Sequence, residues 1–175
     1  MKLKIITCSL LGLALLGCDE SSKYGAKEVN IAQINNVQPS FMAKQKFELG
    51  GGCNMESISP GRKSGRDVIV NKSDSPIQIV GWGVDSIRSV APTTIYLRLQ
   101  DLQAKEYYAL TEKVTRSDVV DYFKKDFYLE SGYKVNLDIN KMPPGEYAAM
   151  IVMDVGGLSI LCSSGQSIRI EGESK

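Results

Sequence analysis

Ser131 and Lys134 are the residues whose spacing first suggests chemistry, because the chain contains no histidine. Without histidine, neither the Ser-His-Asp and Cys-His catalytic arrangements nor the common zinc sites can form. The pair has the S-x-x-K spacing of a serine–lysine dyad. The tetrapeptide leads into a strand-like segment, however, where alternation sends the two side chains to opposite faces. We therefore expect a polar turn and no nucleophilic catalysis.

Acidic residues offer two further possibilities. Asp118, Asp121 and Asp126 lie close together in the sequence and could serve glycoside hydrolysis as paired carboxylates. Helix capping and a solvated helix face explain them without chemistry. Asp85 and Asp154 end strand-like segments and could bind calcium, but no D-x-D-x-D-G loop is present. We predict no catalytic residue, no metal site and no cofactor.

The N-terminus has the pattern of an export signal: Lys2 and Lys4 precede an apolar run, residues 5–16, that is too short to span a bilayer comfortably. The run ends Leu15-Leu16-Gly17-Cys18, which resembles the lipobox of bacterial lipoproteins. That resemblance implies cleavage before Cys18, lipid on its sulfur, and anchoring of the protein to a lipid bilayer. The alternatives are an ordinary cleaved signal or an uncleaved anchor helix.

The lipoprotein resemblance also implies a location. The protein would be lipid-anchored at the cell membrane, with its domain on the periplasmic or extracytoplasmic side. In enterobacterial lipoproteins, an aspartate in the position of Asp19 resembles the signal for retention in the inner membrane. The predicted organisation is a signal peptide at 1–17, lipidated Cys18 with a flexible tether over 18–46, and one β-domain over 47–175.

Charge and cysteine content narrow the function further. Loss of Lys2 and Lys4 leaves 21 − 2 = 19 basic against 20 acidic residues, so no general attraction to nucleic acid is expected. Once Cys8 leaves with the signal and Cys18 carries lipid, only Cys53 and Cys162 remain. In an exported protein such a pair is most simply a disulfide. Free thiols or a metal pair are the alternative, but no C-x-x-C spacing supports them.

Short strands with period-two alternation fill most of the chain after residue 46 and predict an antiparallel two-sheet sandwich. The segment 77–85, IQIVGWGVD, is apolar on both faces, as in a central strand. Its residue Trp82, the only tryptophan, is expected to fill the core beside the disulfide. One short helix is predicted at about 115–125, with Thr115 and Asp118 as a capping box or Ser117 as the cap.

The order Cys53, Trp82, Cys162 is similar to that of the immunoglobulin fold, in which a tryptophan packs on the inter-sheet disulfide. The spacings are longer than in immunoglobulin domains, and no clear tyrosine corner is present. The pieces GWGVD, RSDVVDYF, SGYKVNLDI and PPGEY also resemble immunoglobulin-like β-sandwich modules of bacterial envelope proteins. Such modules often accompany glycan-handling proteins, and the resemblance carries no catalytic residues across.

Tyrosines gather in one third of the chain and suggest a contact surface, since their broad apolar face and polar tip suit protein or sugar partners. The expected function is a non-catalytic lipoprotein that binds another envelope protein. A carbohydrate-binding module for envelope glycans is the alternative, and a hydrolase comes third. The candidate binding surface consists of Tyr107, Tyr108, Tyr122, Tyr128 and Tyr133.

Overall fold

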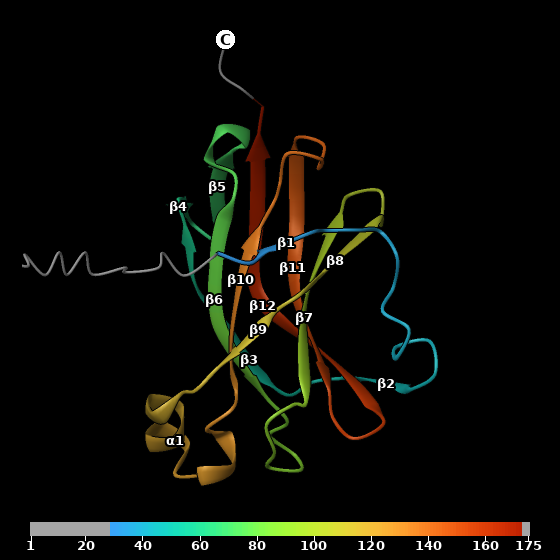
Figure 1. Ribbon diagram of the computed structural model, residues 1–175, viewed down its shortest axis with the longest axis vertical. Coiled ribbons are helices and arrows are strands. Elements are labelled where there is room, and N and C mark those ends of the chain that lie inside the picture. The colour runs from blue at the N-terminus through green and yellow to red at the C-terminus, as the bar shows by residue number, and fades with distance from the viewer. Residues whose placement is uncertain (1–28, 173–175) are drawn as a thin grey trace, which may run out of the picture.

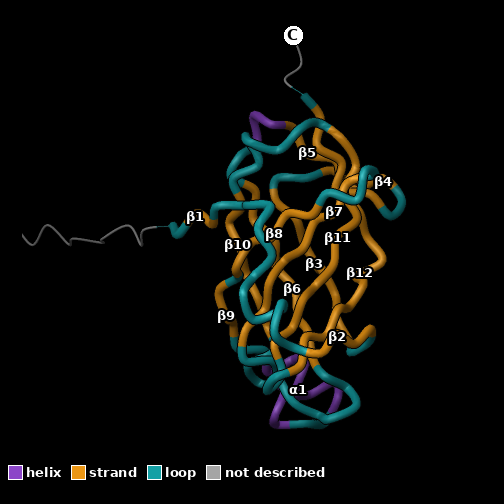
Figure 2. The backbone as a smooth tube through the Cα atoms, turned by 90° about the vertical axis from the view of Figure 1, so that its right-hand side faces the viewer, coloured by secondary structure: helices purple, strands orange, loops and turns teal. Residues whose placement is uncertain are grey.

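The computed structural model describes residues 29–172. In this range the chain is mostly β: two mixed sheets pack as a sandwich, and one short α-helix, α1 (Ser117–Phe123), lies at one end of the strands (Figure 1 and Figure 2). The predicted two-sheet, mostly-β domain with one short helix is confirmed. No helix among these residues has the length and apolar character needed to span a bilayer.

The first sheet contains the segment predicted to be central. Strand β6 (Ile77–Val84) lies between β10 (Gly132–Leu137) and β3 (Gly52–Ser59) and is antiparallel to both. On its other side β10 pairs with β1 (Ile31–Ala32) and with β9 (Glu112–Val114). Because β6 has a neighbour on each side, its central position is confirmed.

The second sheet is built around a long hairpin, since β11 (Gly145–Asp154) pairs with β12 (Leu158–Glu171) across the turn at residues 155–157. Strand β12 is continuous over its 14 residues. The strand β2 (Lys46–Leu49) pairs with β12, off the main path of the sheet. From one edge to the other the remaining order is β4 (Arg62–Ser64), β5 (Asp67–Asn71), β12, β11, β7 (Thr94–Asp101) and β8 (Glu106–Leu110).

The prediction of purely antiparallel sheets is wrong. Strand β1 runs parallel to β10, and both β2 and β5 run parallel to β12. The alternation of apolar side chains fixes which face of a strand is buried, but it carries no information about the direction of the neighbouring strand. Each parallel pair joins segments far apart in the sequence, so no hairpin turn signals it.

Both sheets contribute to one main core. The disulfide predicted between Cys53 and Cys162 is present, with its sulfur atoms 2.05 Å apart and the two Cα atoms separated by 6.2 Å. It links β3 of the first sheet to β12 of the second. The cysteines pack against a core whose buried members include Ile77, Ile79, Leu97, Leu99, Val135, Leu137 and Ile151.

Trp82 does not fill that core. It lies on the outer face of the first sheet, partly buried, in a small separate cluster with Val119 and Tyr128. The core-facing positions beside it belong to Gly81 and Gly83, because successive residues of a strand point to opposite faces. Both faces of β6 are apolar in sequence, so alternation alone does not identify the one that faces the second sheet.

The surroundings of Gly81 leave no room for a side chain at this position. A Cβ added at this position would lie 2.1 Å from the carbonyl oxygen of Asn54 and 2.5 Å from the Tyr133 hydroxyl. Gly81→Ala should therefore lower the free energy of unfolding by about 1–3 kcal/mol, measured by urea denaturation. The matched control is Gly172→Ala, whose Cβ would meet its nearest atom at 3.8 Å. Equal stability of the two variants would contradict this close approach.

An N-terminal arm (residues 29–45) lies against the sandwich. The flexible tether was predicted for residues 18–46, of which 18–28 lie outside the described part of the chain. Asn35 forms a β-bridge with Tyr108, and Met42 is 3% exposed. The Phe41 ring packs on Tyr96 with 5.4 Å between centroids. Phe41 and Met42 thus cover part of the outer face of the second sheet. The predicted signal, Cys18 and Asp19 lie outside the described residues.

The predicted helix is present but shorter than 115–125, and its predicted capping is wrong. The N-cap of α1 is Arg116, which makes no side-chain capping hydrogen bond. A 3₁₀ turn, η2 (Asp126–Tyr128), follows, and a second one, η1 (Lys72–Asp74), lies after β5. The carboxylate that should have completed the capping box, Asp118, binds the Arg116 side chain instead.

Candidate functional site

The five tyrosines predicted as a binding surface do not form one. Only Tyr122 is on the surface, at 81% exposed. The other four, Tyr107, Tyr108, Tyr128 and Tyr133, are between 0% and 6% exposed. The predicted surface is therefore wrong apart from Tyr122.

Different neighbours bury each of the four. Tyr107 and Tyr133 face the main core. Tyr108 points away from it but is covered by Met42 of the N-terminal arm, and burial together with the hydrogen bond to Glu106 raises its pKa to about 12. Tyr128 lies in the cluster beneath α1. The sequence thus shows that these tyrosines gather in one third of the chain, but it does not show that four of the five are buried.

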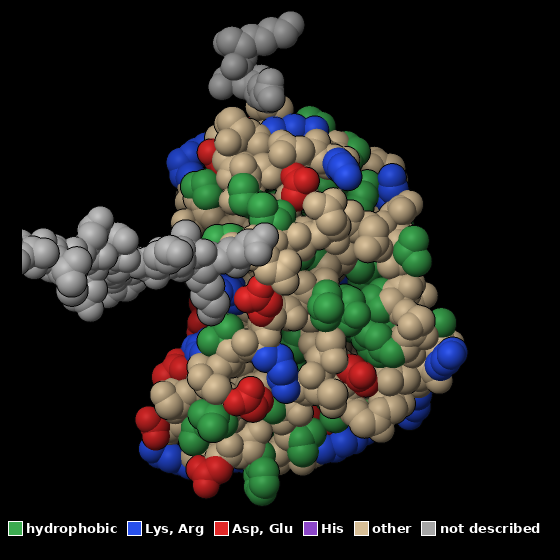
Figure 3. Space-filling view, in the orientation of Figure 1, with side chains coloured by type: hydrophobic (Ala, Val, Ile, Leu, Met, Phe, Trp, Pro, Cys, Tyr) green, Lys and Arg blue, Asp and Glu red, His purple; other side chains and the backbone are tan. Residues whose placement is uncertain are grey.

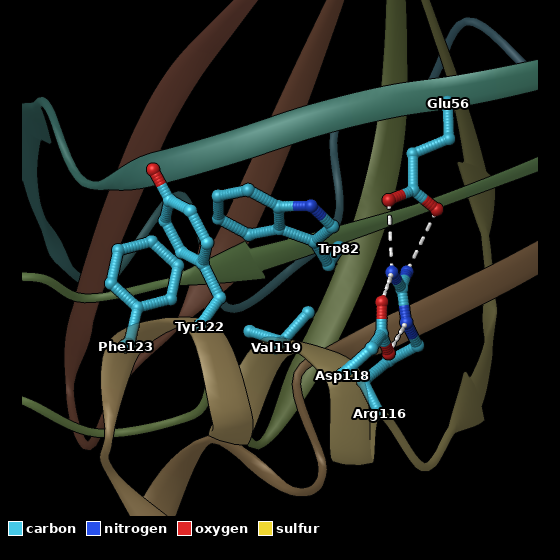
Figure 4. A pocket seen from close by; sticks show the side chains of 7 residues that line it. All are labelled: Glu56, Trp82, Arg116, Asp118, Val119, Tyr122 and Phe123. Carbon is cyan, nitrogen blue, oxygen red and sulfur yellow. Dashed lines mark hydrogen bonds and ion pairs between the residues drawn. The ribbon is translucent and has the colours of Figure 1, made fainter.

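A pocket of about 300 Å³ opens where α1 meets the first sheet. Its apolar part is aromatic: Phe123 makes edge-to-face contacts with Trp82 at 5.5 Å and with Tyr122 at 4.9 Å between centroids. Its other side is charged (Figure 4). We call it the helix-end pocket, and it is lined by Glu56, Trp82, Arg116, Asp118, Val119, Tyr122 and Phe123.

Arg116 joins the two elements that border this pocket. Its terminal nitrogens donate to both carboxylate oxygens of Glu56, at 2.8 and 2.9 Å. Its Nε and Nη2 donate to Asp118 at 2.8 and 2.6 Å, and Nη1 also reaches the Gly81 carbonyl at 3.4 Å. Glu56 occupies the position where the pairing of β3 with β6 shifts register, as at a β-bulge. The guanidinium therefore ties α1 to the sheet.

The same contacts determine the protonation states of Asp118 and Arg116 in the pocket. Hydrogen bonds from Arg116 lower the pKa of Asp118 from 3.8 to about 2, and those to Asp118 and Glu56 raise the pKa of Arg116. Both groups therefore stay charged at neutral pH. A general acid requires the opposite shift, since it must hold a proton at working pH.

The lowered pKa of Asp118 predicts an acid-sensitive helix. A carboxylate whose pKa is lower in the folded chain stabilises it above the unfolded value of 3.8, and this contribution is lost as the pH falls toward about 2. We expect Trp82 fluorescence to report loosening of α1 over that interval. Asp118→Asn should weaken the pH dependence, whereas Asp121→Asn, on the exposed side of the same helix, should leave it unchanged. An identical profile for all three proteins would contradict the assignment.

Apolar side chains are also exposed near the C-terminal end of α1. Phe127 is 75% and Leu129 43% exposed, both just after α1. Ile87, 78% exposed, lies in a turn that Lys125 holds through a 2.6 Å hydrogen bond to Ser89. Figure 3 shows hydrophobic side chains standing among charged ones at this lower end of the molecule. We call this region, with Tyr122, the helix-end patch.

The remaining candidate residues have structural partners. Asp85 is fully buried, accepts the backbone N–H groups of Ile87 and Arg88, and forms an ion pair with Arg88 at 2.9 Å. Asp154 accepts a hydrogen bond from Gln45 at 2.9 Å. In the described part of the chain, no three His, Cys, Asp or Glu residues are placed to hold a metal ion.

The serine and lysine of the S-x-x-K segment are not paired. Ser131 is fully buried, and its hydroxyl has no hydrogen-bond partner among residues 29–172. The Lys134 amine lies 3.6 Å from the Glu112 carboxylate. Asp121 and Asp126 lie on α1 and η2, as expected from the sequence, and neither lines the helix-end pocket.

Sequence reasoning missed Arg116 and Glu56, which are separated by sixty positions. Nothing in the local pattern around either residue indicates the other, because their contact depends on how α1 packs against β3. The chain matches no protein-family model, no curated protein and no solved structure. The site is therefore interpreted from its geometry alone.

Proposed function

We propose that this protein is a membrane-anchored envelope lipoprotein that binds another envelope protein without catalysis. Lipid on Cys18 would hold it at the bilayer, with the domain on the extracytoplasmic side. The domain would belong to the immunoglobulin-like modules of envelope proteins, and the helix-end pocket and patch would form its contact surface.

The exposed helix-end patch is the observation that carries this proposal. Tyr122, 81% exposed, lines the pocket together with Trp82 and Arg116, and Phe127, 75% exposed, lies in the 3₁₀ turn that follows α1. Aromatic residues and arginine are enriched at the energetic centres of protein interfaces. Large apolar side chains grouped on one surface commonly mark interaction sites.

The alternatives are less well supported by the same residues. A hydrolase would need one carboxylate that holds a proton, but Asp118 is held ionised by Arg116. A glycan-binding module would need a flat row of tyrosines, and four of the five predicted tyrosines are buried. The pocket does place Trp82 and Tyr122 beside polar groups, so glycan binding remains the second candidate.

Photocrosslinking tests the proposal. A benzophenone amino acid placed at Tyr122 should capture one specific protein from cell envelopes, while the same probe at the exposed Arg62 of β4 should not. Retention of the protein on peptidoglycan or polysaccharide beads, with no protein captured, would favour the glycan-binding alternative. Mass spectrometry of the mature chain should find acyl groups on Cys18, and an unmodified thiol there would refute the anchor.

Truncation of the patch should separate binding from stability. Tyr122→Ala and Phe127→Ala should each weaken capture of that protein at least tenfold, which corresponds to about 1.4 kcal/mol. Their free energies of unfolding should change by only about 0.5 kcal/mol, because both side chains are exposed. Leu102→Ala is the control, since Leu102 is 81% exposed in another turn. Equal binding by all three variants would place the interface elsewhere.

A further inference from the structure

We infer that the helix-end pocket receives one basic side chain, an arginine or a lysine, from the protein partner. This inference rests on the proposed function, because it names the chemistry by which the same surface would recognise its partner. The inference depends on the charges that line the pocket, on the hydrogen bonds already made by Arg116, and on the aromatic surface beside them.

The charge lining the pocket is negative. Glu56 and Asp118 contribute two carboxylates, and Arg116 contributes the one guanidinium. Glu56 is about one-third exposed and Asp118 two-thirds exposed, at 33% and 67%, whereas Arg116 is 13% exposed. The negative groups therefore face solvent more than the positive group does, and an approaching cation meets the carboxylates first.

Arg116 has no hydrogen-bond donor left for an anion. A guanidinium carries five N–H groups. In this pocket Nε uses one toward Asp118, Nη2 uses two toward Glu56 and Asp118, and Nη1 uses two toward Glu56 and the Gly81 carbonyl. Each carboxylate oxygen, by contrast, can accept a further hydrogen bond. The pocket can therefore accept hydrogen bonds from a donor but can donate none from its arginine.

The aromatic half of the pocket suits the stem of a basic side chain. Trp82, Val119 and Tyr122 lie on one side of the opening and the charged groups on the other (Figure 4). Arginine and lysine carry a long apolar stem that packs along such surfaces while the charged head stays polar. The tryptophan ring adds attraction for the cation itself. The volume, about 300 Å³, is at the small end of ligand sites and fits one side chain.

Trp82 provides a direct test, because it is the only tryptophan and lies in the pocket. The probes are three capped tripeptides, acetyl-Gly-X-Gly-amide, in which X is arginine, its neutral analogue citrulline, or glutamate. The arginine peptide should produce a saturable change in Trp82 fluorescence. The citrulline peptide should bind at least fivefold more weakly, and the glutamate peptide should produce no saturable change. Added salt should weaken the arginine response.

Variants locate the response. Glu56→Gln should weaken binding of the arginine peptide at least threefold, and Asp118→Asn should do the same, while Asp121→Asn should bind as the parent protein does. Circular dichroism of each variant checks that α1 is retained, and rescue of the signal by Asp118→Glu would confirm that charge is the cause. Equal binding of the arginine and citrulline peptides, or preferential binding of glutamate, would overturn the inference.

Failure of this inference can be distinguished from failure of the proposed function. If Tyr122→Ala abolishes capture of the partner while Glu56→Gln and Asp118→Asn leave it intact, the protein-binding proposal stands. The inference that the partner inserts a basic side chain is then refuted. If the arginine peptide binds but no protein is captured at Tyr122, the pocket chemistry stands and the protein-binding proposal is refuted.

Discussion

Replacing both disulfide cysteines, Cys53→Ala with Cys162→Ala, should lower the free energy of unfolding by about 4–5 kcal/mol. The bond closes a loop across 109 positions of the sequence, so its loss frees a large share of the unfolded chain. Thermal unfolding followed by circular dichroism should show a melting temperature lower by about 10–20 °C.

Reduction provides the control for this prediction. Dithiothreitol should lower the melting temperature of the parent protein toward that of the double variant and leave the variant itself unchanged. A parent protein whose stability is indifferent to the reductant would show that the two sheets are held together without the crosslink. Such a result would mean that the apolar core, and not the disulfide, provides most of the stability of the domain.

Arg116→Met should cause the second large effect. The substitution keeps an apolar stem but removes every hydrogen bond to Glu56 and Asp118, and we expect a loss of about 2–3 kcal/mol in the free energy of unfolding. This value lies below that of a fully buried ion pair, because both carboxylates retain access to water. Urea denaturation measures the loss.

A double-mutant cycle with Glu56→Gln then isolates the contact between α1 and β3. The control is Arg62→Met in β4, whose side chain is exposed and makes no ion pair with any residue from 29 to 172. A coupling energy near zero between positions 56 and 116 would show that α1 is held by its aromatic packing alone. In that case the fluorescence of Trp82 in Arg116→Met should match that of the parent.

The local pattern of apolar residues predicted the β-rich sandwich and the central position of β6, because each depends on neighbours along the chain. The same pattern could not orient β6. With Ile77 and Ile79 on one face and Val80 and Trp82 on the other, both faces are apolar. The face that meets the second sheet carries Ile77, Ile79 and Gly81, and the missing side chain of Gly81 leaves room for Tyr133.

The candidate site was less predictable, since its residues meet only through tertiary packing. Tyr108 points away from the main core, as an exposed tyrosine would, yet the N-terminal arm covers it. Glu56 and Arg116 look like ordinary surface charges in sequence and become partners across the boundary between α1 and the first sheet. Helix propensity and alternation describe neighbours along the chain, whereas this site depends on contacts between distant segments.

Because the N-terminal arm packs against the domain, only a short segment is left to link the domain to a lipid anchor. If Cys18 carries lipid, only residues 19–28 separate it from the first described residue, and so short a segment spans at most about 35 Å when fully extended. The domain would then stay within a few nanometres of the lipid headgroups, and any partner would have to present its binding surface inside that thin layer.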